Sequence, residues 1–138
     1  MTIEAKEMES AVEGILFAAG EPVDIKRICM ALDADRSVVE QVLQRRGCTM
    51  ADVDCFVFHQ ANARITDLVA RKLGIPPEKY YKNIDRYGNT SAGSIPLVLS
   101  ELHEMGRVGP GSRVLAVGFG GGLTWGGALL EFGERRPL

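Results

Sequence analysis

From Met50 onward the chain alternates short β-rich runs with amphipathic helices, and this alternation restricts its fold more than any other feature. The predicted elements, in order, are a strand at 53–58, a helix at 63–73, a strand at 80–84, a helix at 95–105, and strands at 114–117 and 123–132. This order is typical of an α/β domain. The last two strands flank a glycine-rich loop at 118–122 and are predicted to be antiparallel neighbours.

Three short helices are predicted before this region. They cover residues 7–19, a short stretch after Asp24, and residues 38–46, which Gly47 closes. Three short helices with tight turns indicate a helix-turn-helix-like start. Residues 1–36 carry eight acids and four bases, a net charge of −4, so this segment is not expected to grip a nucleic-acid backbone.

The composition is that of a globular protein of one ordinary domain. The chain has 138 residues, of which 46% are hydrophobic and 25% charged. No apolar run reaches the length of a membrane span, and the N-terminus is acidic where a secretory signal is basic, so a cytoplasmic protein is expected. Cys29, Cys48 and Cys55 match no zinc-site spacing, so reduced thiols and no metal site are expected.

Three separated motifs carry the chemistry. They are FHQAN at 58–62, YGNTSAGS at 87–94 and GFGGGLTWG at 118–126. His59 and Asn89 are two neutral hydrogen-bond donors that can converge on one developing oxyanion. A site of this type usually also needs a nucleophile, which the rest of the chain does not obviously provide.

On these motifs, residues 38–132 resemble the C-terminal half of the β-ketoacyl-acyl-carrier-protein synthase III enzymes, which have the thiolase fold. The expected fold is therefore one half of a thiolase-like fold, a mixed sheet with helices. The resemblance implies that His59 and Asn89 belong to a Cys-His-Asn triad. It further implies that Asn62 and Arg64 line the pantetheine channel, that Phe119 lies near the reacting centre, and that the backbone around Gly120 approaches the thioester.

The resemblance also implies substrates and partners. These enzymes load an acyl group from coenzyme A onto a cysteine and condense it with malonyl-acyl-carrier-protein as carbon dioxide leaves, without a cofactor. The family's nucleophilic cysteine lies in the N-terminal half, and none of the three cysteines here has a comparable context. We therefore expect the chain to be inactive in the full condensation by itself. The helix at 95–105 is apolar on more than one narrow stripe, so it is expected to be deeply buried. Its cover is expected to come from a second copy, from a complementing N-terminal half or in part from residues 7–32.

Residues 7–36 resemble a different family, the N-terminus of segregation and condensation protein B, which uses winged-helix domains. The expected organisation is a helical segment at 1–37 with partial winged-helix character, followed by the thiolase-like half-domain at 38–138. Two alternatives to a synthase fragment stay open. One is a non-enzymatic interaction module of the chromosome-segregation machinery, and the other is a relic of gene fusion.

Overall fold

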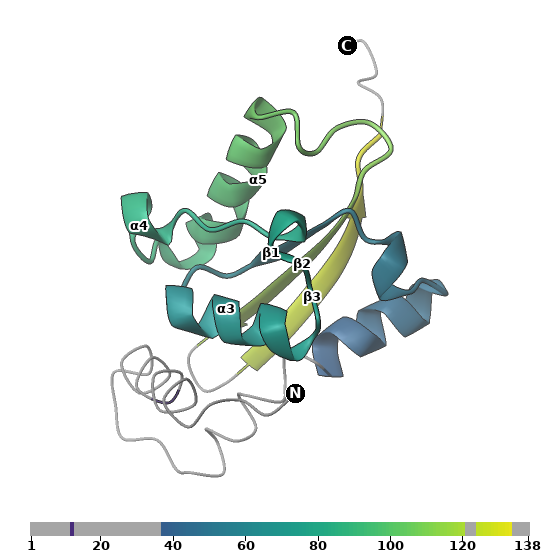
Figure 1. Ribbon diagram of the computed structural model, residues 1–138, viewed down its shortest axis with the longest axis horizontal. Coiled ribbons are helices and arrows are strands. Elements are labelled where there is room, and N and C mark those ends of the chain that lie inside the picture. Colours follow the sequence, from purple (N-terminus) through teal and green to yellow (C-terminus); the bar gives the residue numbers. More distant parts are fainter. Residues whose placement is uncertain (1–11, 13–36, 121–123, 134–138) are drawn as a thin grey trace.

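The computed structural model describes residue 12, residues 37–120 and residues 124–133 (Figure 1). A helix over 37–46 comes first. The elements that follow are η1 (Met50–Asp52), β1 (Cys55–Phe58), α3 (Ala63–Lys72), η2 (Pro77–Lys79), α4 (Ile84–Tyr87), η3 (Ser91–Gly93), α5 (Ser94–Glu104), β2 (Arg113–Gly120) and β3 (Thr124–Glu131), where η denotes a 3₁₀ helix. Apart from Val12, which is helical, the helices predicted within residues 7–32 lie outside the described residues.

The three strands form one mixed sheet in the order β1-β2-β3. β1 pairs with β2 in parallel, and β2 pairs with β3 as the antiparallel neighbour that the sequence predicts. Asp54 fixes the start of the parallel pair: its N–H donates to the Arg113 carbonyl at 2.9 Å, and its carboxylate accepts from the Arg113 N–H at 2.8 Å. The α/β architecture expected from the sequence is confirmed.

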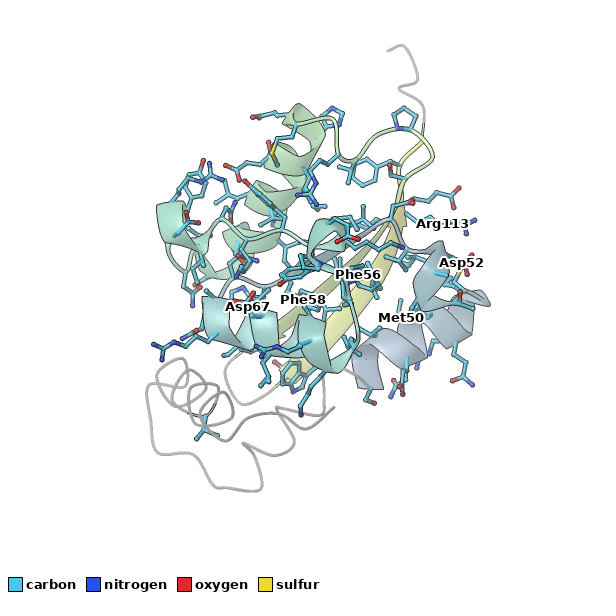
Figure 2. The ribbon with its side chains drawn as sticks, in the orientation of Figure 1. Met50, Asp52, Phe56, Phe58, Asp67 and Arg113 are labelled. Carbon is cyan, nitrogen blue, oxygen red and sulfur yellow. The ribbon has the colours of Figure 1, made fainter. Side chains whose placement is uncertain are left out.

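The sheet is covered on both faces, as Figure 1 shows, with α3 and helix 37–46 on one side and α5 on the other. Successive strand residues face opposite sides. Phe56 and Phe58 therefore join the core under α3 and helix 37–46 (Figure 2), whereas Cys55 and Val57 join the core under α5. The alternation explains why all four residues of β1 are buried.

Glycines end the helices where the sequence predicts. Gly47 and Gly74 have φ values of 63° and 67°, in the left-handed region that favours glycine. After each, the next residue's N–H reaches back five residues: Cys48 to Leu43 and Ile75 to Ala70. This hydrogen bond is the signature of the Schellman motif. No helix in the described part of the chain is long and apolar enough to cross a membrane.

The strand predicted at 80–84 is wrong. Tyr80 makes only an isolated parallel bridge to Phe56, and Ile84 already begins α4. Side-chain hydrogen bonds replace a strand ladder here: the Asn83 N–H donates to the Gln60 side chain at 3.3 Å, and the Asn83 amide donates to Glu101 at 3.0 Å. Side-chain partners of this kind compete with regular secondary structure.

Two further predictions need correction. The helix predicted at 95–105 exists as α5, but only Ser94, Val98 and Leu102 are buried along it, and Met105 is 48% exposed. Val98 and Leu102 face the sheet, Glu101 contacts α4 and Asn83 before it, and the other positions of the helix are half-buried or exposed in the part of the chain that the structure describes. The glycine-rich loop is also shorter than predicted, because Gly118 and Gly120 belong to β2 and pair with Gly126 and Thr124 of β3.

Gly127 of β3 packs directly against helix 37–46, and this contact generates a stability prediction. A Cβ at this position would lie 2.7 Å from Val38 Cγ1 and 3.2 Å from Val42 Cγ2. Valine cannot easily rotate away. Gly127→Ala should lower the free energy of unfolding by about 1–3 kcal/mol in urea denaturation, as overpacking does.

Gly126 is the matched control, since a Cβ there would meet no atom within 4 Å. Gly126→Ala should leave stability unchanged or raise it by about 0.4–1 kcal/mol through the unfolded chain. Adding Val38→Ala to Gly127→Ala should recover part of the loss. Equal losses for the two glycine variants would show that helix 37–46 does not sit on Gly127.

Candidate active site

His59 directly follows β1, at the carboxyl end of the parallel pair. Its backbone N–H donates to the Val117 carbonyl at 2.8 Å, so β2 holds the residue although it lies beyond the strand. Ligands of open α/β sheets bind beyond the carboxyl ends of the strands. The position predicted for His59 from the sequence, at the end of a strand, is thus the position at which such sheets build sites.

Ser94 anchors the ring of His59 from the other side. Ser94 is the first residue of α5 and is 1% exposed. Its Oγ lies 2.6 Å from Nδ1 of His59 and accepts the N–H of Gln60 at 3.2 Å. Gln60, also 1% exposed, donates its side-chain amide to the Phe58 carbonyl at 2.8 Å. The end of β1 and the start of α5 are thereby joined.

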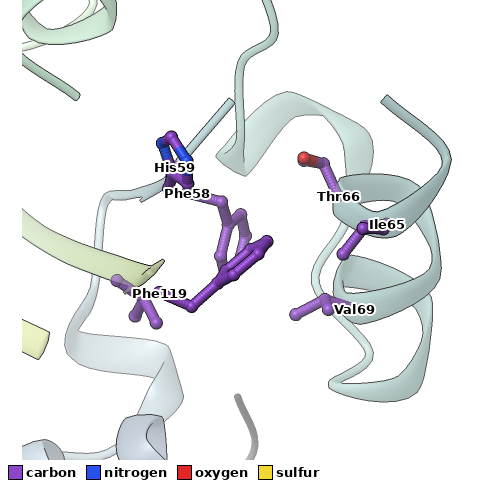
Figure 3. Close-up of a pocket in the computed structure, with 7 residues that line it drawn as sticks. Phe58, His59, Ile65, Thr66, Val69 and Phe119 are labelled. Carbon is purple, nitrogen blue, oxygen red and sulfur yellow. The ribbon is translucent and has the colours of Figure 1, made fainter. Parts of the chain in front are cut away.

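Phe119 lies against His59. The two rings meet edge to face with centroids 5.3 Å apart, and Phe119 in turn lies 5.0 Å from the centroid of Trp125. Beside them is a small pocket between the sheet and α3 (Figure 3). Its lining is mostly apolar and consists of Phe58, His59, Ile65, Thr66, Val69, Val117 and Phe119.

Asn89 lies on the exposed connection between α4 and η3, five residues before the start of α5. Its Oδ1 accepts the N–H of Ser91 at 2.9 Å, so the amide NH₂ is the end that remains to donate. Ser91 has φ of 50°, rare for a residue with a side chain. The hydrogen bonds of the described residues do not join Asn89 to His59.

Glu101 holds the segment that carries Asn89 onto α5. Its carboxylate accepts from Asn83 at 3.0 Å, from Arg86 at 2.7 Å and from the Tyr87 hydroxyl at 3.0 Å. Burial raises the pKa of Glu101, but the three donors together outweigh it, so the pKa lies below the ordinary value. The carboxylate therefore stays charged at neutral pH and keeps its three partners.

The predicted substrate-binding residues fall in different places. Asn62 is the N-cap of α3, and its Oδ1 accepts the Arg64 N–H at 2.9 Å, so it has a structural role in the chain. Arg64 is exposed in the first turn of α3. Gly120 is exposed at the last position of β2, where a Cβ would touch only Thr124 Oγ1 at 3.5 Å. Phe119 is the one that touches His59.

No hydrogen bond within the described residues joins Cys48 or Cys55 to His59. Cys55 is buried in the core under α5, and burial raises the pKa of its thiol, which disfavours the reactive thiolate. Cys48 follows the helix stop at Gly47 and points its sulfur toward the Arg46 carbonyl at 3.5 Å. Cys29 lies outside the described residues. Those residues also hold no cluster of three or more metal-ligating side chains.

Sequence reasoning gave no role to Ser94, Gln60 or Glu101. Gln60 and Ser94 lie inside two of the three motifs, so their closeness in sequence to His59 and Asn89 could have indicated a role in the site. Glu101 carried only a weak signal, as one of two acidic residues in the helix. Its partners come from residues 14 to 18 positions away, and only the fold brings them together.

The fold belongs to a known class. The chain superposes on β-ketoacyl-acyl-carrier-protein synthase III of Thermus thermophilus with a TM-score of 0.76 and 40% identity, over 83% of this chain and 36% of that one. The Pseudomonas aeruginosa enzyme gives a TM-score of 0.73 and 38% identity, over 84% and 37%. The described residues thus form one half of a thiolase fold.

The sequence identifies the family. The profile of the family described as 3-oxoacyl-[acyl-carrier-protein] synthase III C terminal matches residues 43–132. The β-ketoacyl-acyl-carrier-protein synthase III of Thermosynechococcus vestitus is 52% identical over 95 residues, 69% of this chain and 29% of that protein. The chain therefore belongs to the β-ketoacyl-acyl-carrier-protein synthase III family, as the three motifs indicate.

The chain spans about a third of the length of the relatives it matches. The Symbiobacterium thermophilum synthase III is 50% identical over 126 residues, 91% of this chain and 38% of that protein. A match of this length includes part of the first 36 residues. The resemblance of residues 7–36 to segregation and condensation protein B is not supported by these relatives and stays a prediction.

The surroundings of His59 generate a prediction about pH. Burial lowers the pKa of His59 below its ordinary value, so the unfolded chain binds the proton more readily than the folded chain. The part of the unfolding free energy that depends on a neutral His59 is fully present above the pKa of His59 in the unfolded chain, about 6.5. It is lost as pH falls through that value toward the folded pKa. Unfolding free energy measured in urea between pH about 7.5 and about 5 should therefore decrease.

His59→Gln should remove most of this decrease, and His103→Gln, at an exposed position on α5, should leave it in place. A proton titration of His59 by NMR should give a midpoint lower in the folded chain than in urea. A His59 midpoint that is higher in the folded chain would contradict the prediction.

Proposed function

We propose that this chain carries the decarboxylation half-site of a β-ketoacyl-acyl-carrier-protein synthase III type acyltransferase of fatty acid biosynthesis. The observation that carries the proposal is the placement of His59 in a chain of this family. The residue lies at the carboxyl end of β1, is held at Nδ1 by Ser94, and is flanked by Phe119. A neutral imidazole held in this way is suited to donate a hydrogen bond to a developing oxyanion.

The reaction that suits these donors is loss of carbon dioxide from a malonyl thioester. The bond between the methylene and the carboxylate carbon breaks, carbon dioxide leaves, and the electron pair moves onto the thioester oxygen as an enolate. His59 and Asn89 donate to that oxygen. Without an acyl-enzyme for the enolate to attack, the methylene carbon takes a proton from water, and an acetyl thioester results. Each such donor contributes about 2.7–4 kcal/mol of transition-state stabilisation in comparable sites.

The remaining assignments follow from the same proposal. Phe119 and the backbone at Gly120 border the thioester, and Asn62 and Arg64 line its pantetheine path. The substrates are coenzyme A and acyl-carrier-protein thioesters in the cytoplasm, and no resident cofactor or metal is needed. Strained residues gather at functional sites, and the left-handed Ser91 beside Asn89 supports a site on this connection.

We infer that the described cysteines do not supply the acyl-accepting thiol and that the chain by itself does not complete the condensation. Incubation with malonyl-coenzyme A should release carbon dioxide, and incubation with acyl-coenzyme A should leave the protein mass unchanged. His59→Ala and Asn89→Ala should each slow carbon dioxide release by roughly 10²–10³-fold. His103→Ala, on the exposed side of α5, is the control that should keep the rate.

Two results would contradict the proposal. Carbon dioxide release that persists in His59→Ala would show that His59 is not a donor in this reaction. A folded sample that releases no carbon dioxide would show that the chain lacks the activity. A stable acyl adduct on Cys29, Cys48 or Cys55 would contradict the separate claim about the thiol.

We further propose that α5 and the edge of the sheet meet a second copy of the chain or a complementing N-terminal half. Ile95, Leu97 and Leu99 are only half-buried, and within the described residues β3 pairs on one side alone, with β2. Apolar surface and an unpaired edge of this kind favour association. Sedimentation velocity of the isolated chain over a concentration series should show dimers. A monomer at all concentrations that binds no apolar dye would contradict this expectation.

A further inference from the structure

Ser94 makes a buried contact with His59, and the proposed function does not specify which of the two side chains donates the proton in it. The Oγ atom lies 2.6 Å from Nδ1, closer than the 3.2 Å that separates it from the Gln60 nitrogen. Val98 and Leu102 fix α5 in the core one and two turns further on, so Ser94 is held on a rigid element. The hydroxyl is therefore positioned by packing.

The protons at this contact can be assigned. A serine hydroxyl has one hydrogen and two lone pairs. The Gln60 N–H occupies one lone pair. If Nδ1 carried the proton, Oγ would accept twice, and its own hydrogen would need another acceptor. Among the described residues no other acceptor is recorded for it, and at 1% exposure water does not replace one. A buried donor without a partner is costly.

We propose that Ser94 is a positioning residue for His59: its hydroxyl donates to Nδ1 and keeps the imidazole proton on Nε2. Nδ1 and Nε2 lie on different sides of the ring, so the N–H is directed away from Ser94. The catalytic consequence rests on the proposed function, in which Nε2–H donates to the thioester oxygen. The tautomer itself does not depend on that function.

His103 provides an internal reference for this assignment. It is the other of the two histidines in the chain. Its Nδ1 lies 3.3 Å from the Val108 carbonyl, which can only accept, so a hydrogen bond between them requires the proton on Nδ1 of His103. The two histidines should therefore be opposite tautomers in the same molecule.

The test is a long-range ¹⁵N–¹H NMR spectrum of the full, unmodified chain at pH about 8, above the ordinary histidine pKa. The spectrum of His103→Gln lacks the His103 signals, so the histidine signals that remain belong to His59. We expect an unprotonated Nδ1 and a protonated Nε2 in His59, and the reverse in His103. A His59 that is protonated at Nδ1, or that populates both tautomers, would overturn the proposal without any variant of Ser94.

Ser94 variants then link the tautomer to the hydroxyl. Ser94→Ala should mix the two tautomers of His59, and Ser94→Thr, which retains the hydroxyl, should keep the Nε2–H form. An unchanged tautomer in a folded Ser94→Ala chain would show that another group sets it. The two proposals fail separately: the expected tautomer without carbon dioxide release defeats only the function, and release with Nδ1–H defeats only this inference.

Discussion

The parallel pairing of β1 with β2 determines where His59 and Phe119 lie relative to each other, and the rest of the site is arranged around them. Its register places Phe58 beside Val117, and the same ladder continues one step further through the His59 N–H. Because β2 runs on past the end of β1, Phe119 reaches the ring of His59 from the neighbouring strand. A shift of this register by one residue would turn Phe119 to the opposite face and remove that contact.

α5 contributes to the core and to the site through the same turns. Val98 and Leu102 bury its inner face, Ser94 at its start contacts His59, and Glu101 holds the preceding segment. The packing of α5 against the sheet therefore also holds Ser94 and Glu101 in place. A buried polar network of this kind specifies one arrangement only when each member has its partner. Thr90 Oγ1 is the exception among the described side chains, buried without a recorded partner beside Asn89.

Sequence patterns correctly predicted the helices and strands whose formation depends on residues close together in the sequence. β1, α3 and the β2–β3 pair are where β-rich runs, helical periodicity and glycine stops predict them. The segment at 80–84 failed because partners distant in sequence, Gln60 and Glu101, decide its conformation. The burial of α5 was overestimated because its apolar residues lie around more than one face, whereas only Ser94, Val98 and Leu102 are buried against the described neighbours. His59, Asn89 and Phe119 were recognisable as motif residues, whereas the contact with Ser94 required the fold.

The two proposed donors differ in how the chain supports them. His59 is fixed by a strand ladder, a buried hydroxyl and an aromatic edge, all from within this chain. Asn89 is exposed, and its recorded contact is the local turn to Ser91. Preorganised donors stabilise an oxyanion more than mobile ones, because no reorganisation accompanies the reaction. Covering the exposed connection would therefore change the geometry of Asn89 far more than that of His59, whose orientation this half of the fold already sets.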